Sequence, residues 1–350
     1  MSTEKMQNSM PANNLKLSLK NLEDQVIVIT GASSGIGLAT ARMAAAKGAK
    51  VVAAARNEEA LKSLVDELKS KGQTAISVTA DVSNEEEVNK IAEMAIGEFG
   101  HFDTWVNNAG VSIYGPGTEI STPDMKQMFE TNFWGVVYGT KAAAKHFQET
   151  GQPSAIINVG SIFGNKSSVA QSIYASSKFA VHGWTESVRM EFEKKHLPIS
   201  VTLIHPGKID TPYTQHAHSY LENQPTHIGM IYPPEAVAEA ILFAAQKPKR
   251  DMFVGAQSKF LTVLSHLLPR FTDRYVEKVM FPSQYDDRPS KPKEESSLYQ
   301  AGYGLHERGI NKGWKRKKSY YVKATERPVL ATVAITSLAL IGMKLLKHKK

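Results

Sequence analysis

Short runs of β-branched and other apolar residues alternate with longer segments at helical spacing from residue 25 onward. We expect strands near residues 25–30, 50–55, 74–79, 104–107, 155–159, 200–205 and 251–254. Helices are expected in the gaps, at residues 35–47, 57–71, 84–99, 122–150 and 172–195. This alternation is typical of a parallel sheet covered by helices on both faces. The sequence therefore predicts an α/β fold, a doubly wound parallel sheet of about seven strands in a single domain with a C-terminal extension.

Composition excludes several classes of protein. The chain has 350 residues, of which 42% are hydrophobic, 22% charged and 8% aromatic, which argues against wholesale disorder, a collagen-like repeat and a polytopic membrane protein. It contains no cysteine, which excludes a disulfide scaffold, an iron–sulfur cluster and a cysteine nucleophile. The histidines show no regular metal-ligand spacing, so we expect no metal site.

The basic character of the chain lies in its C-terminal part. Residues 288–350 hold 15 of the 42 Lys and Arg but 4 of the 34 Asp and Glu, which gives this stretch a net charge of +11 and the rest −3. Pro and Gly among charged residues predict a basic linker at residues 282–327. Residues 328–346 form an apolar run flanked by lysines, which favours a membrane anchor, with a helix docked on protein as the alternative. Nucleic-acid binding is disfavoured, because no aromatic residues are interleaved with the bases.

A glycine-rich turn follows the first expected strand, with the sequence Thr30-Gly31-Ala32-Ser33-Ser34-Gly35-Ile36-Gly37. Glycine lets the backbone turn sharply and approach a pyrophosphate, and the N-terminus of the next helix offers free N–H groups and a partial positive charge. The turn therefore favours a dinucleotide site, although a tight turn without a ligand would use the same residues.

Further motifs stand at the ends of the expected strands. They are Asp81 after the third, Asn107-Asn108-Ala109-Gly110 after the fourth, Ser161 after the fifth, Tyr174-x-x-x-Lys178 on the next helix, and Pro206-Gly207 after the sixth. In this order and spacing, over about residues 22–260, the chain resembles the short-chain dehydrogenase/reductase family, and the Thr-Gly-x-x-x-Gly-x-Gly pattern resembles its compact oxidoreductase branch. The resemblance implies a Rossmann-like fold.

Four residues match the family's catalytic positions. Tyr174 and Lys178 are four residues apart and share one helix face, so the ammonium group can lower the pKa of the phenol and make it a usable acid and base. Ser161 is placed to orient a substrate oxygen, although a serine that caps a turn would look the same. The resemblance assigns Asn132 to a water that links the lysine to solvent.

The resemblance also implies a nicotinamide cofactor. The expected contacts are Gly31, Ser33, Ser34, Gly35, Ile36, Gly37, Arg56, Asp81, Val82, Asn108, Tyr174, Lys178, Ile209 and Thr211. At the end of the second strand Ala55 stands where an acidic residue would favour NAD, and Arg56 follows, able to pair with a 2′-phosphate. NADP(H) is therefore favoured over NAD(H), with an exposed arginine that opens a helix as the alternative.

These features predict an NADP(H)-dependent oxidoreductase that interconverts a carbonyl and a secondary alcohol, with Tyr174 as acid and base. The apolar tail favours a lipophilic substrate and lipid contact, and similar enzymes often form homo-oligomers. A catalytically silent nucleotide sensor or membrane-attached scaffold of the same fold is the alternative, and an enoyl reductase is disfavoured by the serine and tyrosine spacing. We expect a flexible leader at residues 1–22, a cytoplasmic catalytic domain at residues 23–281 with a substrate lid between residues 206 and 234, then the linker and apolar run.

Overall fold

Seven parallel strands form the central sheet of the computed structural model, which describes residues 17–326. Their order across the sheet is β11-β7-β6-β4-β1-β2-β3. Their bounds are β1 Val26–Thr30, β2 Lys50–Ala55, β3 Ala75–Thr79, β4 Thr104–Asn107, β6 Ser154–Val159, β7 Ile199–Pro206 and β11 Asp251–Val254. Each expected strand is present, with ends within one residue of the prediction. The predicted doubly wound parallel sheet is thus confirmed.

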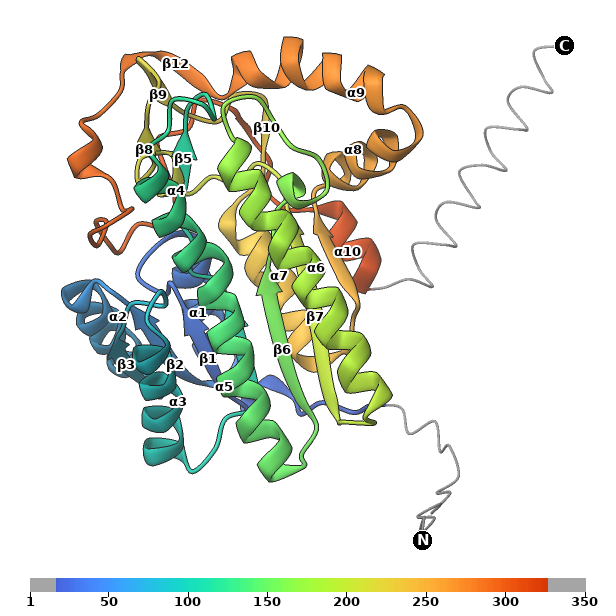
Figure 1. Ribbon diagram of the computed structural model, residues 1–350. Coiled ribbons are helices and arrows are strands. Elements are labelled where there is room, and N and C mark those ends of the chain that lie inside the picture. Colours follow the sequence, from blue (N-terminus) through green and yellow to red (C-terminus); the bar gives the residue numbers. More distant parts are fainter. Residues whose placement is uncertain (1–16, 327–350) are drawn as a thin grey trace, which may run out of the picture.

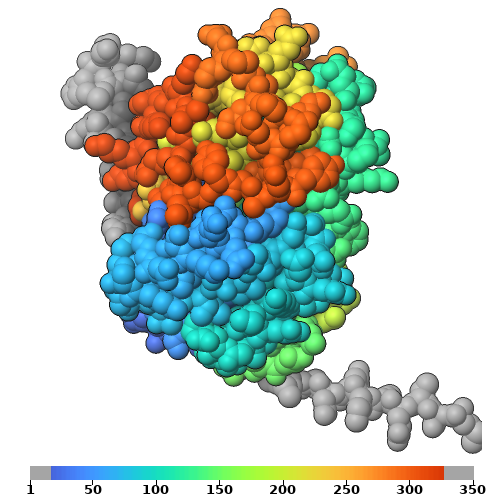
Figure 2. All heavy atoms as spheres, turned by 90° about the vertical axis from the view of Figure 1, so that its left-hand side faces the viewer, coloured from blue at the N-terminus to red at the C-terminus, as the bar shows by residue number. Residues whose placement is uncertain are grey.

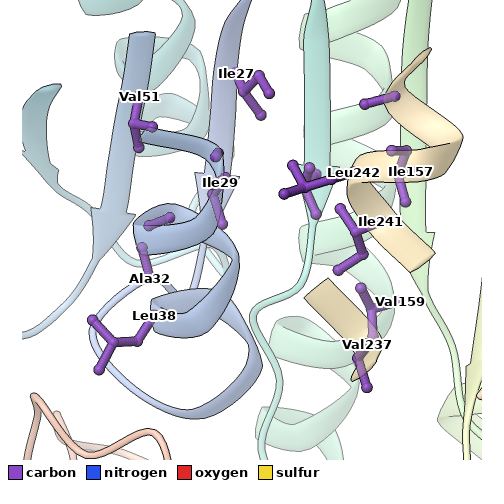
Figure 3. Close-up of a cluster of buried hydrophobic side chains, with 14 of the residues drawn as sticks. Ile27, Ile29, Ala32, Leu38, Val51, Ile157, Val159, Val237, Ile241 and Leu242 are labelled. Atoms are coloured by element: carbon purple, nitrogen blue, oxygen red, sulfur yellow. The ribbon is translucent and has the colours of Figure 1, made fainter. Parts of the chain in front are cut away.

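Helices cover both faces of the sheet (Figure 1). One face packs against α1, Gly35–Ala46, α2, Glu58–Ser70, and α7, Pro234–Gln246. The other packs against α3, Glu85–Phe99, α5, Gly135–Thr150, and α6, Ser172–Lys194. In the first layer Ile27 and Val51 from the sheet join Leu38 of α1 and Ile241 of α7 in one buried cluster, shown in part in Figure 3. Because both faces are covered, the strands are apolar almost throughout, which is why they read as continuous β-branched runs.

The strand order reverses between β1 and β4, which lie side by side in the sheet. Chain crossovers lead away from this point in opposite directions, which leaves a crevice at the carboxyl ends of the two strands. The glycine-rich turn follows β1 and the Asn107–Gly110 segment follows β4, so both reach this crevice. The topology therefore places the motifs of the sequence at one edge of the sheet.

The single helix expected over residues 122–150 is interrupted in the structure. It divides into α4, Thr122–Phe129, a π-helical turn η2, Glu130–Trp134, and α5. Thr131 and Asn132 on η2 are buried. Such π turns hold one extra residue in a helix and are frequent at functional sites.

The expected substrate lid lies above the carboxyl edge of the sheet and is paired with other segments. It contains η4 Pro212–Thr214, β8 His218–Ser219, β9 Asn223–Pro225 and β10 Met230–Ile231. Strand β8 pairs with β5, Ile113–Tyr114, while β9 pairs with β12, Tyr285–Pro289, and β10 with β13, Trp314–Lys315. Two of these three partners come from the C-terminal part of the chain.

The C-terminal part differs from the extended linker that the sequence favours. Its elements after β11 are α8 Ala256–Leu267, α9 Pro269–Tyr275, η5 Val276–Met280, η6 Phe281–Ser283, β12, η7 Lys293–Glu295, β13 and α10 Tyr320–Glu326. Leu298 and Val322 are fully buried, each in a different core cluster. Figure 2 shows the orange atoms of this part lying directly on the blue atoms of the first strands and helices. This part is held by a few separate buried apolar side chains, which also include Leu261 and Val276, and by many backbone hydrogen bonds, and neither produces a periodic apolar pattern.

No helix within residues 17–326 is long and apolar enough to cross a membrane. The proposed anchor at residues 328–346, and most of the proposed leader, lie outside the described residues.

Candidate active site

Two adjoining cavities lie at the carboxyl edge of the sheet. The first, of about 180 Å³, is lined by the glycine-rich turn, by the ends of β2 and β3, and by Ser297 to Gly302 on one side. The second, of about 130 Å³, is lined by Ser161, Tyr174 and Lys178. Both cavities share the lining residues Ile36, Asn108, Gly110, Thr211 and Tyr213. A ligand in the first cavity can therefore extend into the second.

The glycine-rich turn depends on glycine at three places. Gly31 and Gly35 have φ angles of +68° and +54°, in the left-handed region that favours glycine. A Cβ atom on Gly37 would stand 2.1 Å from the carbonyl oxygen of Gly31. Any side chain there would push the turn away from the helix. The amide of Asn108 donates to the carbonyl oxygen of Thr30 at 2.9 Å and fixes the turn from the β4 side.

Arg56 and Asp81 face each other across the end of the first cavity. The Arg56 side chain is 21% exposed, and its Nη1 atom lies 3.6 Å from a carboxylate oxygen of Asp81. Its Nη2 atom donates to the main-chain oxygen of Ser297 at 2.6 Å. Within residues 17–326 the buried Nη1 atom makes no hydrogen bond. The Arg56 guanidinium therefore offers the cavity one N–H donor, on Nη1, that makes no hydrogen bond within the described residues.

A strap formed by residues 297–307 covers the outer side of this cavity. Leu305 donates its N–H to the carbonyl oxygen of Ser33, and Gly35 donates its N–H to the carbonyl oxygen of His306, at 2.8 and 2.9 Å. Glu307 forms an ion pair with Arg42 of α1 at 2.8 Å. The strap therefore contacts the glycine-rich turn directly.

Tyr174 and Lys178 lie on the same face of α6, as expected, and both are buried. The Lys178 ammonium donates to the carbonyl oxygen of Val159 at 3.0 Å and lies 5.9 Å from the centre of the Tyr174 ring. Ser161 is at the end of β6, and its hydroxyl accepts from the N–H of Phe163 at 3.1 Å. The capping role that the sequence left as an alternative is therefore present, and the same hydroxyl faces the phenol of Tyr174.

Burial controls the titration of both groups. It raises the pKa of Tyr174, which the hydroxyls of Tyr213 and Ser161 partly oppose. Burial also lowers the pKa of Lys178 to about 8. The lowering of the phenol pKa by Lys178 that the sequence suggests is therefore not observed in the protein alone, where loss of water around the ring has the largest effect. Tyr174 is a protonated phenol at neutral pH, beside an ammonium that is still largely charged.

Asn132 lies behind these groups, fully buried on η2. Its amide oxygen accepts from the N–H of Val111 at 2.8 Å, and its amide nitrogen donates to Val111 and to the Ser177 hydroxyl at 3.0 and 3.1 Å. These bonds tie the segment after β4 to α6. Neither cavity is lined by Asn132.

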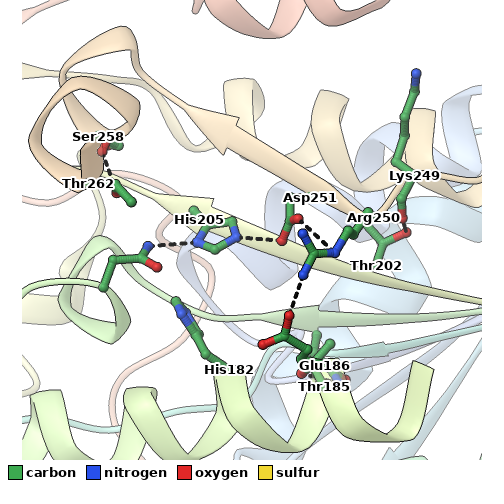
Figure 4. Close-up of polar contacts among 12 residues, drawn as sticks. His182, Thr185, Glu186, Thr202, His205, Lys249, Arg250, Asp251, Ser258 and Thr262 are labelled. Atoms are coloured by element: carbon green, nitrogen blue, oxygen red, sulfur yellow. Dashed lines mark hydrogen bonds and ion pairs between the residues drawn. The ribbon is translucent and has the colours of Figure 1, made fainter. Parts of the chain in front are cut away.

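A histidine cluster supports the Ser161 turn from the other side (Figure 4). His182 on α6 accepts from the N–H of Ser161 at 3.4 Å, and its ring meets that of His205 edge-on at 4.8 Å. His205 in turn contacts Asp251 and Asn165 at 3.0 Å each. Burial lowers the pKa of His182 to about 3, so the ring is neutral.

The structure brings together nearly all residues that the sequence singled out. The expected cofactor contacts line one cavity or the other except Gly37, which shapes the turn from within α1. Sequence reasoning missed Gln171, Gln284 and the strap, whereas Tyr213 and His227, which also line the cavities, lie in the segment that it expected to be a substrate lid. Gln171 could have been suspected from its position just before the tyrosine motif, whereas Gln284 has no local signal. In the described part of the chain, no group of three or more acidic or histidine side chains could hold a metal ion.

Comparisons with known proteins agree with this geometry. A family model described as short chain dehydrogenase matches residues 25–221. The chain is 64% identical over 337 residues to the uncharacterized oxidoreductase YxnA of Bacillus subtilis, covering 96% of this chain and 95% of that protein. An uncharacterized oxidoreductase of Staphylococcus aureus is 34% identical over 229 residues, 65% of this chain and 94% of that protein.

Solved structures give the same picture. A short chain dehydrogenase/reductase from Burkholderia phymatum, in complex with NAD, superposes with a TM-score of 0.65 at 25% identity, over 78% of this chain and 100% of that one. A short-chain type dehydrogenase/reductase from Mycobacterium marinum gives 0.59 at 28% identity, over 67% of this chain and 94% of that one.

Proposed function

This chain belongs to the short-chain dehydrogenase/reductase family, and on that premise we propose that it is an NADP(H)-dependent oxidoreductase that interconverts a ketone and a secondary alcohol. One observation carries the proposal. Ser161, Tyr174 and Lys178 line a cavity that opens directly onto the cavity of the glycine-rich turn. A hydride donor and a proton donor can then act on the same substrate carbonyl.

The first cavity fits a nicotinamide dinucleotide. Gly31 and Gly35 turn the backbone with positive φ angles and carry no side chain, which suits close approach of a pyrophosphate. Asp81 and Val82 line the opposite wall, where the adenosine would lie. The unused Nη1 donor of Arg56 supports NADP over NAD, because a 2′-phosphate would supply its missing partner.

The residues of the second cavity suit the proton transfer. When bound, the nicotinamide supplies or accepts the hydride. Because burial raises its pKa, the Tyr174 phenol holds a proton that it can give to a carbonyl oxygen during reduction. The Ser161 hydroxyl donates to that same oxygen as negative charge develops on it. The Lys178 ammonium then favours the phenolate that remains.

We assign Asn132 to the same site as a residue that positions its neighbours. Its three hydrogen bonds hold Val111, which lines the first cavity, against α6. They thereby fix the position of that wall relative to Tyr174. The water that the resemblance places beside Asn132 stays a prediction. The catalytically silent scaffold remains the alternative, but it would leave the serine, tyrosine and lysine constellation without a use.

The test compares Tyr174→Phe with Tyr320→Phe, which changes an exposed tyrosine on α10. Purified proteins are screened against ketones and secondary alcohols by NADPH absorbance, and cofactor affinity is measured separately. Tyr174→Phe should lower turnover by a factor of about 100 to 10,000, with cofactor affinity nearly unchanged, because only the hydroxyl is lost. Turnover that survives this change would show that another group moves the proton and would refute the assignment.

A further inference from the structure

Buried polar atoms without hydrogen-bond partners line both cavities. Among residues 17–326, 17 buried side-chain nitrogen or oxygen atoms make no hydrogen bond, although some of them, such as Asp210 Oδ2, form ion pairs. Six of the 17 belong to residues that line the first cavity, where the cofactor is proposed, and five belong to four residues that line the second, namely Gln171, Tyr213, His227 and Gln284. Folded proteins pair nearly all such atoms, so a cluster of them in a cavity indicates a ligand that supplies the missing partners.

The two glutamines carry most of this argument. Gln171 is 1% exposed and precedes α6, and although the Tyr114 hydroxyl is nearby, neither amide atom makes a hydrogen bond within the described chain. Gln284 is 2% exposed; its amide nitrogen donates to the Ser168 hydroxyl at 2.7 Å, which leaves its oxygen unpaired among residues 17–326. Together these side chains offer a ligand both a donor and acceptors.

His227 and Tyr213 add two uncharged groups to this lining, of which the Tyr213 hydroxyl is close enough to the Tyr174 phenol to interact with it. The His227 ring stacks on Tyr213 with centres 6.5 Å apart, and burial lowers the pKa of His227 to about 3. At neutral pH the ring is therefore a neutral donor or acceptor. The Tyr213 hydroxyl lies near the phenol of Tyr174, at the reacting end of the cavity.

The described lining of the cavity contains no Asp, Glu or Arg. The hydrogen bonds of its two lysines go to uncharged groups: Lys208 donates to the carbonyl oxygen of Ile228 at 2.9 Å and to the Ser283 hydroxyl at 2.5 Å, and Lys178 donates to the carbonyl oxygen of Val159. A cationic group of a substrate would therefore be buried without a counter-charge, which is costly.

The volume also limits the ligand. The cavity is small, at about 130 Å³, which is similar to an apolar cavity that binds benzene, even before the nicotinamide end of a cofactor occupies part of it. Ile162, Phe163 and Met280 complete the wall and can pack against a short carbon chain.

Building on the carbonyl and alcohol chemistry proposed above, we propose that the substrate is a small hydroxyketone that carries no cationic group and whose additional hydroxyl group is bound by Gln171 and Gln284. The product of reduction is the corresponding diol or polyol. This assignment replaces the lipophilic substrate that the apolar tail favours. Long aliphatic ketones would leave the two buried amides unpaired.

A matched set of methyl ketones tests the assignment with the full-length protein and NADPH. Hydroxyacetone has a hydroxymethyl group beside the carbonyl. Butanone has an ethyl group at that position, and pyruvate has a carboxylate. Hydroxyacetone should have the highest kcat/KM, by a factor of about ten to one hundred over butanone, since one buried polar group is left unpaired by butanone. Equal or better use of butanone or of pyruvate overturns the assignment.

Variants of the two glutamines test whether these residues cause the preference for hydroxyacetone over butanone. Gln171→Met and Gln284→Met keep the side-chain length but remove the amide, and each should reduce the preference for hydroxyacetone at least several-fold. Gln148→Met, at an exposed position on α5, is the control and should leave it unchanged. If Gln171→Met does not fold, Gln284→Met decides. An unchanged preference in a folded variant of either glutamine overturns the assignment.

A binding measurement separates this assignment from the proposed function. With NADP⁺ present, propylene glycol should raise the thermal unfolding midpoint more than secondary butanol does. If no ketone is reduced while the glycol still protects more strongly, the proposed oxidoreductase function fails and the cavity assignment stands. If the two alcohols protect equally or neither protects, the assignment is overturned whatever the outcome of the turnover assay.

Discussion

Removal of the Arg56 guanidinium tests the cofactor preference at the atom that supports it. In the protein alone Nη2 is bonded to Ser297 and Nη1 has no hydrogen bond among residues 17–326, so a 2′-phosphate would gain one free donor. A hydrogen bond between charged groups is worth about 1.5 to 3 kcal/mol. Asp81, 3.6 Å away, already attracts the guanidinium and partly screens it, so the lower half of this range is expected. A change of about 1.4 kcal/mol in binding free energy corresponds to a tenfold change in affinity. Arg56→Ala should therefore weaken NADP⁺ binding at least about tenfold.

NAD⁺ binding provides the internal comparison. Because NAD⁺ lacks the 2′-phosphate, Arg56→Ala should change its affinity little. Arg56 also holds the strap, so Glu307→Gln serves as the control: it weakens the ion pair of the strap with Arg42 without touching Arg56. That change should affect both cofactors by the same factor. Calorimetric titration of both cofactors against the three proteins is the assay, and equal affinities in the unmodified protein, or equal losses for both cofactors in Arg56→Ala, would refute the reasoning.

Three further outcomes are expected. Gly37→Ala should lower the free energy of unfolding by about 1 to 3 kcal/mol, because its Cβ would collide with the Gly31 oxygen, whereas Gly97→Ala on an exposed part of α3 should be neutral or slightly stabilising in the same urea titration. The neutral His182 stabilises the fold fully above about pH 6.5 and less as the pH falls towards its folded pKa of about 3, since the unfolded chain binds the proton first. Between about pH 7 and pH 5 the unfolding free energy should thus fall by about 2 kcal/mol in total more in the unmodified protein than in His182→Gln; an equal fall would contradict this cause. Finally, a chain stopped at Arg327 should lose any membrane association that the full chain shows after high-salt washing, and equal partition of both proteins would favour a helix docked on protein.

Local sequence determined the sheet and the residues at the centre of the candidate site. Buried parallel strands need continuous apolar side chains, so each run of β-branched residues marks one strand. Tyr174 and Lys178 share a helix face by their spacing alone, and the glycines after β1 must be glycines because of the backbone turn they make. These features depend on residues close together in the chain, and a single sequence contains all of them.

Tertiary structure decided how the cavities are closed and what lines them. The strap is held largely through backbone carbonyls, such as that of Ser297, which accepts a hydrogen bond from Arg56. Because every residue type has a backbone carbonyl, no side-chain pattern predicts this contact. Gln284 reaches the second cavity from more than a hundred residues beyond Gln171, through the pairing of β12 with β9. The raised pKa of Tyr174 is likewise a product of burial, which depends on how the whole chain packs around the ring and which the spacing of Tyr174 and Lys178 does not reveal.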